Sequence, residues 1–202
     1  MSQDFEPIDT RLTYDQAKAL FDDYVKDPGV RMHCRESEQI MRALARHLGQ
    51  DEEQWGILGL LHDIDFDQTK DDPKNHCVLA RDILADAGAS SEAIEVICSH
   101  AWGTPCGGGD VQDKKRTRNI EHALVAAETL TGLIYATALM NPEKKLAKVT
   151  VKSVKKKFKS KAFAKNCDRT FIAEIENTGI ELEVFLGIAL KAMQEMSDEL
   201  GL

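Results

Sequence analysis

The chain has 202 residues, of which 43% are hydrophobic, 30% charged and 6% aromatic. This length supports one domain with a sizeable core, and a composition rich in Ala, Leu, Lys and Glu favours helices. The N-terminal residues lack the basic and apolar regions of a signal peptide, and the uncharged stretch at 129–142 is too short to cross a bilayer. The five cysteines form no C-x-x-C pair. We therefore expect a reduced cytoplasmic protein without a disulfide framework or a membrane span.

Capping signals and apolar periodicity predict helices along most of the chain. A capping box at Thr13 opens the first helix, and Asp27-Pro28-Gly29 is expected to end it. Asp51 is expected to cap the third helix, and Ser90 or Ser91 the fifth. The expected helices cover about 14–26, 33–48, 52–61, 73–87, 91–99, 119–140 and 180–200. Residues 102–118 are predicted to form a mobile loop, and the glycine triplet at 107–109 is interpreted as the hinge of a lid. No strand pattern or internal repeat is present, so the predicted fold class is all-α.

Charge is unevenly distributed. The net charge is −8, but residues 144–165 contain ten lysines and no acid, which leaves −18 on the rest of the chain. A charge run is usually a solvated face. Val151, Val154 and Phe158 are spaced to dock one side of this segment on the fold. A docked segment could use its lysines to recruit phosphate to a nearby site, which is the more specific functional interpretation. Nucleic-acid binding is disfavoured because the acidic body would repel the phosphate backbone.

The dipeptide His62–Asp63 closes an apolar run at the expected end of a helix. Two adjacent side chains at a helix end can approach one cation without the chain folding back. Imidazole nitrogens and carboxylate oxygens suit Zn, Mn, Fe or Co. This dipeptide also occurs by chance, so the interpretation depends on the other donors in the chain.

Three further histidines, His33, His76 and His100, are expected at the ends of helices. Helix ends that cluster at one end of a bundle are a suitable place for a metal site. We exclude two histidines: His47 is interpreted as a surface residue near a helix C-terminus, and His122 lies off the helix face that carries the acid described next.

Glu128 lies in the most apolar predicted helix, among Ala126, Ala127 and Leu130. An unpaired buried carboxylate costs several kcal/mol and is normally protonated, ion-paired or metal-bound. Histidines from neighbouring helices favour the metal. The alternative is a glutamate that reaches a lysine or solvent at the helix surface.

The order of a histidine, then His-Asp, two more histidines and an acid in Ala-Ala-x-x-Leu-Thr-Gly resembles the HD-domain superfamily of metal-dependent phosphohydrolases. Leu-Leu-His-Asp-Ile-Asp at 60–65 is similar to small bacterial HDIG-type proteins. The resemblance covers about 14–140 and continues at 152–157 and 168–169. It implies a single HD-type helical bundle over residues 1–202, with the metal-site core at about 14–140 and a lysine-rich helical extension at 141–202.

The resemblance also implies the roles of the candidate residues. One metal would be held by His33, His62, Asp63 and Glu128. Asp63 would bridge to a second metal bound by His76 and His100. The expected cofactor is one or two divalent transition-metal ions (Mn, Fe, Co, Zn or Ni). The expected reaction is hydrolysis of a small phosphate ester, such as a nucleotide or phosphomonoester, by a metal-bound hydroxide, with His62 and Asp63 as catalytic residues.

The sequence departs from the family pattern at two positions. The last acid is usually aspartate, and the extra methylene of Glu128 displaces its carboxylate by about 1.5 Å. Some dinuclear relatives carry His-His where this chain has His100-Ala101. The first metal is therefore the firmer expectation. Asp65 is a candidate to orient a water or a ligand histidine, and Lys70 is a candidate phosphate contact. The alternative is that both belong to a solvated acidic loop with Asp71 and Asp72.

Two alternatives remain open at this point. A mixed-valent di-iron oxygenase on the same scaffold would use the same donors, and a non-catalytic metal-stabilised regulatory or binding module would explain Glu128 in place of aspartate. The expected partner is a small phosphorylated substrate, without a membrane and without nucleic acid. The sequence does not fix the oligomeric state.

Overall fold

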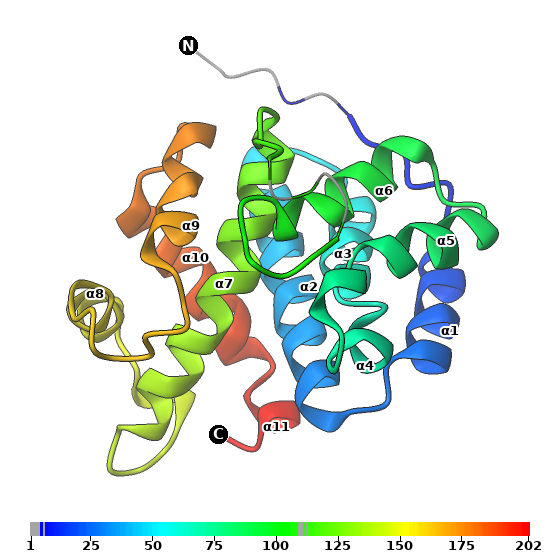
Figure 1. The fold of residues 1–202 in the computed structure, drawn as a ribbon. Helices are drawn as coiled ribbons and strands as arrows, with labels where there is room; N and C mark the ends of the chain where they lie inside the picture. The colour runs from blue at the N-terminus through cyan, green and yellow to red at the C-terminus, as the bar shows by residue number, and fades with distance from the viewer. Residues whose placement is uncertain (1–4, 6, 109–110, 112) are drawn as a thin grey trace.

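The computed structural model describes residues 5, 7–108, 111 and 113–202, and within these ranges the chain is helical and contains no strand (Figure 1). The longer helices are α1 (Tyr14–Tyr24), α2 (Pro28–Leu48), α3 (Glu52–Leu61), α5 (Val78–Asp86), α6 (Ser91–Cys98), α7 (Asn119–Leu139), α8 (Val151–Lys159) and α10 (Leu182–Glu195). Short elements are α4 (Phe66–Thr69), η1 (Pro73–Asn75), η2 (Ser99–Ala101), η3 (Leu146–Lys148), α9 (Arg169–Ala173), η4 (Glu174–Thr178) and α11 (Ser197–Leu200). The all-α prediction is confirmed.

Helix α2 organises the bundle, because it packs against α3, α7 and α10. Helices α1, α4, α5 and α6 lie on one side of the α2–α3 pair, and α8 and α9 lie on the other (Figure 1). The C-terminal helices therefore pack on the same bundle as the N-terminal ones. Helix α8 lies at the outer edge, and its Val154 is fully buried while most of its lysines face outward.

Helices α2 and α3 approach each other closely at Gly59. A Cβ atom on Gly59 would lie 2.7 Å from the backbone oxygen of Ser37 in α2. The apolar stripe of α3, formed by Trp55, Leu58 and Leu61, is buried in the core. A side chain at position 59 would push the helices apart, so glycine here fixes how near the end of α3 comes to α2.

The capping predictions for α1, α3 and α6 are confirmed. Helix α2 begins at Pro28, five residues earlier than expected. The Asp27 side chain accepts the N–H groups of Gly29 and Val30, and proline is favourable at the first helical position. The segment 27–29 therefore starts α2, whereas α1 already ends at Tyr24. His33 consequently lies in the second turn of a helix, and the prediction that it starts one is wrong.

The single helix expected from Pro73 is divided. It consists of η1 and α5, separated at Cys77, whose φ of 64° is left-handed. Few residues other than glycine adopt this conformation, and the sequence gives no signal for it. The last predicted helix also divides into α10 and α11, at Met196. The short elements α4, α9 and η4 were not predicted.

Helix α7 is long and apolar enough, by length and composition alone, to cross a membrane, but 61% of its most apolar window is buried within the fold. The central helix of a bundle has the same profile. The cysteines are free thiols, and three of them are buried.

The loop 102–118 is tied to the bundle near its C-terminal end. The Arg116 guanidinium donates two 2.7 Å hydrogen bonds to the Glu174 carboxylate and also bonds the backbone oxygens of Ser99 and Trp102. Of the predicted hinge glycines, two are described and Gly109 lies outside the described residues. The loop prediction agrees with the described residues, and a lid motion stays a prediction.

Candidate metal centre

All six predicted donor residues meet at one place in the bundle. His33 comes from α2, His62 and Asp63 directly follow α3, His76 lies between η1 and α5, His100 lies in η2, and Glu128 is in the middle of α7. These elements are adjacent because α2, α3, α7 and η2 pack together. The structure thus brings together residues that are far apart in the chain.

Asp63 lies between two pairs of histidines. Its Oδ2 atom is 3.8 Å from Nε2 of His33 and 3.6 Å from Nε2 of His62. Its Oδ1 atom is 3.6 Å from Nε2 of His76 and 3.4 Å from Nε2 of His100. One carboxylate therefore presents one oxygen to each histidine pair, which is the arrangement a bridging ligand requires.

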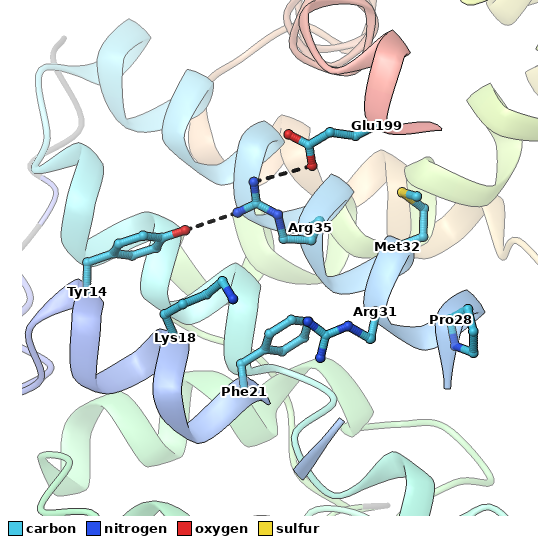
Figure 2. A pocket seen from close by; sticks show the side chains of 8 residues that line it. All are labelled: Tyr14, Lys18, Phe21, Pro28, Arg31, Met32, Arg35 and Glu199. Carbon is cyan, nitrogen blue, oxygen red and sulfur yellow. Dashed lines mark hydrogen bonds and ion pairs between the residues drawn. The ribbon is translucent and has the colours of Figure 1, made fainter. Parts of the chain in front are cut away.

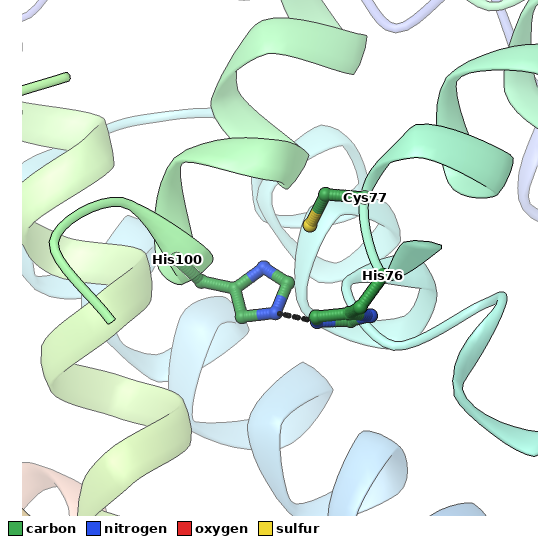
Figure 3. Close-up of side chains that lie close together, drawn as sticks. All are labelled: His76, Cys77 and His100. Atoms are coloured by element: carbon green, nitrogen blue, oxygen red, sulfur yellow. Dashed lines mark hydrogen bonds between the residues drawn. The ribbon is translucent and has the colours of Figure 1, made fainter. Parts of the chain in front are cut away.

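Two sets of potential ligand atoms result. The first donor group consists of His33, His62 and Glu128, whose ligand atoms all lie within 4.8 Å of one another, with Glu128 Oε2 3.8 Å from His33 Nε2. The second donor group consists of His76 and His100. Cys77 lies beside them, and its sulfur completes a second set of atoms within 4.8 Å of one another (Figure 3). Sequence reasoning missed Cys77, because a lone cysteine carries no spacing signal.

The hydrogen bonds at Nδ1 fix the tautomer of each histidine. The Nδ1 atom of His62 lies 2.8 Å from Gly59 O, and that of His100 lies 2.7 Å from Ile97 O. A carbonyl oxygen only accepts, so both Nδ1 atoms carry the proton. The Nδ1 of His76 lies 2.8 Å from Asp65 Oδ1, a carboxylate that accepts in the same way. In the neutral rings, the Nε2 atoms are therefore left as lone-pair donors.

His33 is oriented by Thr131. Its Nδ1 lies 2.9 Å from Thr131 Oγ1, and that hydroxyl donates to Glu128 O at 2.7 Å. Because the hydroxyl proton is used there, Thr131 accepts from His33. Sequence reasoning missed Thr131, although its position three residues after Glu128 places both on one helix face. Outer partners of this kind hold a metal-binding histidine in its productive orientation.

Asp65 is fully buried and orients His76, as predicted. Its second oxygen accepts the backbone N–H of Cys77 at 2.8 Å and of Ala80 at 3.0 Å. These bonds attach the start of α5 to the segment that follows α3. They also hold Cys77 in its left-handed conformation, directly after His76.

Each pair of facing Nε2 atoms requires a proton or a cation between the two nitrogens. The Nε2 atoms of His33 and His62 are 3.0 Å apart, and those of His76 and His100 are 2.9 Å apart. Two unprotonated nitrogens repel at this distance, so each pair requires a shared proton or a cation. Nitrogens bound at right angles to one ion, each at about 2.1 Å, lie about 3.0 Å apart. The donor set therefore fits a transition-metal ion in each group.

Burial and mutual contacts shift the pKa values of the donor residues. Burial lowers the pKa of His62 to about 3 and raises that of Glu128 to about 7. Burial opposes the charged form of His100 as well, but its contacts with Asp63 outweigh burial and raise its pKa to about 9. A proton on His100 thus supplies positive charge in the absence of another cation.

The centre opens to solvent on the side of His33 and Glu128. The His33 side chain is 29% exposed, whereas that of His62 is fully buried. A cavity of about 600 Å³ lies on this side and is lined by His33, Glu128, Thr104 and Phe171, among others. None of its described lining residues is a lysine or arginine. The structure therefore gives no support for phosphate contacts from Lys70 or the lysine-rich segment.

A larger cavity of about 720 Å³ lies between α1 and α2, away from these donors (Figure 2). Lys18, Arg31 and Arg35 line it, but each is already paired. Lys18 and Arg31 bond Asp22, and Arg35 bonds Glu38 and Tyr14. This cavity contains none of the predicted site residues, and the bonds of Arg31 to Asp22 and of Arg35 to Tyr14 join α2 to α1.

The two excluded histidines lie outside the centre. His47 is exposed at the end of α2. His122 bonds the carboxylate of Glu174 at 2.6 Å. That carboxylate is the one that anchors Arg116, so His122 belongs to the network that ties down the 102–118 loop.

Comparison with known proteins identifies the class. Residues 30–105 match the family model of the HD domain. The matched range contains five of the six donor residues, while Glu128 lies beyond it. No curated protein and no solved structure matches the chain. Residues 30–105 therefore form an HD domain, a domain type of metal-dependent hydrolases, and the histidine and acidic groups of the chain are of the kind that could hold divalent metal.

Proposed function

We propose that this protein is a metal-dependent phosphohydrolase that acts on a small phosphate ester. The observation that carries the proposal is the position of Asp63 between two pairs of inward-facing histidine nitrogens. Centres in which one carboxylate joins two metal ions clamp a phosphoryl group and favour in-line attack by water. The match of residues 30–105 to the HD-domain model supports the same reaction class.

The geometry supports the following ligand roles. In the proposal, His33, His62 and Glu128 would hold one ion, His76 and His100 would hold a second, and Asp63 would offer one carboxylate oxygen to each. Glu128 reaches within 3.8 Å of His33 Nε2 from the middle of α7, so the longer side chain is compatible with a ligand role. Divalent metal held there supplies Lewis acidity toward phosphoryl oxygens and lowers the pKa of water.

The protein residues themselves orient the donors and admit the substrate. Gly59 O, Ile97 O, Asp65 and Thr131 each bond one Nδ1–H, so the rings are held before any ligand arrives. The cavity beside His33 and Glu128 gives the phosphate ester access. No lysine or arginine is among its described lining residues, so in the proposal the bound metal would have to balance the charge of the phosphoryl group.

The experiment is metal analysis combined with phosphate release. Protein purified without chelator is analysed by elemental mass spectrometry, and p-nitrophenyl phosphate and a panel of phosphate esters are assayed with Mn, Co, Ni and Zn. We expect bound transition metal and metal-dependent phosphate release. His62→Ala and Asp63→Asn should each reduce the rate of phosphate release at least about 10²-fold, because each variant loses a side chain that is proposed to hold the metal. His47→Ala, an exposed histidine, is the matched control.

The result also separates the alternatives. Iron with oxygen-dependent turnover and no phosphate release would favour the oxygenase. Bound metal without turnover, with activity appearing in Glu128→Asp, would favour a regulatory module derived from an enzyme. Unchanged phosphate release in both His62→Ala and Asp63→Asn would overturn the proposal.

A further inference from the structure

One buried acid next to the donor groups is not used by the site described above. Glu36 lies one helical turn after His33 in α2 and is only 4% exposed. Its Oε1 atom has no hydrogen-bond partner in the described part of the chain, and no ion pair neutralises it. Burying an unpartnered carboxyl group is costly, so its presence here calls for a partner that arrives from outside.

A cavity leads to this carboxyl group. It has a volume of about 420 Å³ and is lined by Glu36 together with Met32, Tyr135 and Leu200, and by His33 and Thr131. The last two residues also line the cavity at the opening of the first donor group. The Glu36 cavity, as we call it, therefore adjoins that opening.

The walls of the Glu36 cavity define the chemistry of its ligand. Apart from Glu36, the described lining is apolar or neutral except for His33, and it contains no lysine or arginine. In the empty cavity, burial raises the pKa of Glu36 to about 8. A ligand group that donates N–H bonds would satisfy the carboxyl oxygens, and a cationic one would also restore the carboxylate. An anionic group would find no lysine or arginine among the described lining residues to pair with.

We propose that the Glu36 cavity receives the leaving group of the phosphate ester and that Glu36 accepts hydrogen bonds from an amino group on it. This inference rests on the proposed function and narrows the substrate class to amino-bearing phosphate esters. In the reaction, the P–O bond to the leaving group breaks, water supplies the new oxygen on phosphorus, and the amino alcohol leaves with the remaining proton. Glu36 acts as a binding and specificity residue and does not touch the reacting atoms.

The test uses substrates that differ only in the amino group. One pair is 2-aminoethyl phosphate and ethyl phosphate, and the other is adenosine 5′-monophosphate and purine riboside 5′-monophosphate. For each pair, kcat/KM is measured with metal-loaded wild type, Glu36→Leu, Glu36→Gln and the exposed control Glu53→Gln. The first pair reports an alkylammonium group and the second an aromatic amine.

We expect wild type to prefer the amino-bearing member of at least one pair by about 10-fold or more, as for a hydrogen bond to a charged group. The preference should fall to within about 3-fold in Glu36→Leu, stay intermediate in Glu36→Gln, and persist in the control. Glu36→Leu removes an unpartnered polar group, and circular dichroism checks that it is folded.

Hydrolysis without any amino preference, or a preference that survives Glu36→Leu, would overturn the inference and leave the phosphohydrolase proposal intact. If no ester is hydrolysed, the proposed function fails by itself. Dissociation constants of the same pairs, measured by calorimetry on the metal-loaded protein, then decide the inference: equal affinity for both members of each pair would overturn it.

Discussion

The carboxylate of Asp65 holds the imidazole of His76 through a 2.8 Å bond between Oδ1 and Nδ1. The bond fixes which nitrogen of His76 faces the second donor group. Replacing Asp65 by asparagine removes the charge that supports this tautomer. We expect the affinity of the second metal to fall about 10- to 100-fold in Asp65→Asn, the usual effect of losing such a partner.

Calorimetric metal titration measures this effect. Asp71→Asn, an exposed acid of the same segment, is the control and should titrate like wild type. Two unchanged binding events in Asp65→Asn would show that the second donor group does not depend on this bond.

The close approach at Gly59 predicts a stability effect. In Gly59→Ala the new Cβ would lie 2.7 Å from Ser37 O, a backbone atom that cannot move aside cheaply. We expect a loss of about 1–3 kcal/mol in the free energy of unfolding, as for other overpacked sites, together with weaker metal binding because His62 follows α3. Gly187→Ala, whose Cβ would meet only ordinary contact at 3.8 Å, should lose nothing. Urea unfolding compares the two, and equal stabilities would contradict this account.

Glu36 predicts a pH dependence of stability in chelator-treated protein. Its pKa is raised from 4.5 to about 8 by burial, so the folded state holds a proton that the unfolded state has lost in this window. Wild type is therefore expected to lose up to about 1.4 kcal/mol of stability per pH unit from this group as pH rises between these values. Glu36→Leu lacks this loss, and its advantage over wild type should grow with pH.

The comparison is made by urea unfolding at pH 5 and at pH 8, with Glu53→Gln as the exposed control. A stability difference between Glu36→Leu and wild type that is the same at both pH values would mean that Glu36 is already ionised in the folded protein.

The ion pair between Arg116 and Glu174 is expected to anchor the 102–118 loop to the bundle. Burial raises the pKa of Glu174, but the hydrogen bonds from Arg116 and His122 outweigh it and lower that pKa to about 2. Arg116→Ala should cost up to about 3 kcal/mol, because the mostly buried Glu174 carboxylate keeps only His122 among its described partners, and should speed proteolysis within 102–118. Arg46→Ala, which removes an exposed ion pair with Glu52, should cost less than about 1 kcal/mol. Equal proteolysis rates in the two variants would argue against anchoring.

Metal binding is expected to release protons. At pH 7 His100, with a pKa of about 9, is charged, and Glu128, with a pKa of about 7, is partly protonated. Both must lose these protons to act as ligands, so binding should release about one proton or more per chain. Calorimetry in buffers of different ionisation enthalpy measures this number. A binding heat that is independent of the buffer would show that the donors are already deprotonated.

Features of the fold that depend on neighbouring residues were predicted better than features that depend on contacts between distant residues. The caps at Thr13, Asp51 and Ser90 place helix starts correctly, because a cap acts on the next three residues only. The break at Cys77 was missed, because its left-handed backbone is held by Asp65, twelve residues earlier. The early start of α2 was missed although Asp27 and Pro28 provide a cap, since the same residues also read as a stop.

The sequence by itself determined the all-α class, the HD-type order of donors and the chemical type of each donor, since these depend on residue identity and short spacing. Only the tertiary structure decided that Asp63 faces both histidine pairs, that Thr131 orients His33 across 98 residues, and that Glu36 lines a cavity beside them. Those relationships depend on how α2, α3 and α7 pack. Packing is set by contacts such as that at Gly59, between residues that are distant in the chain and therefore leave no periodic signal in it.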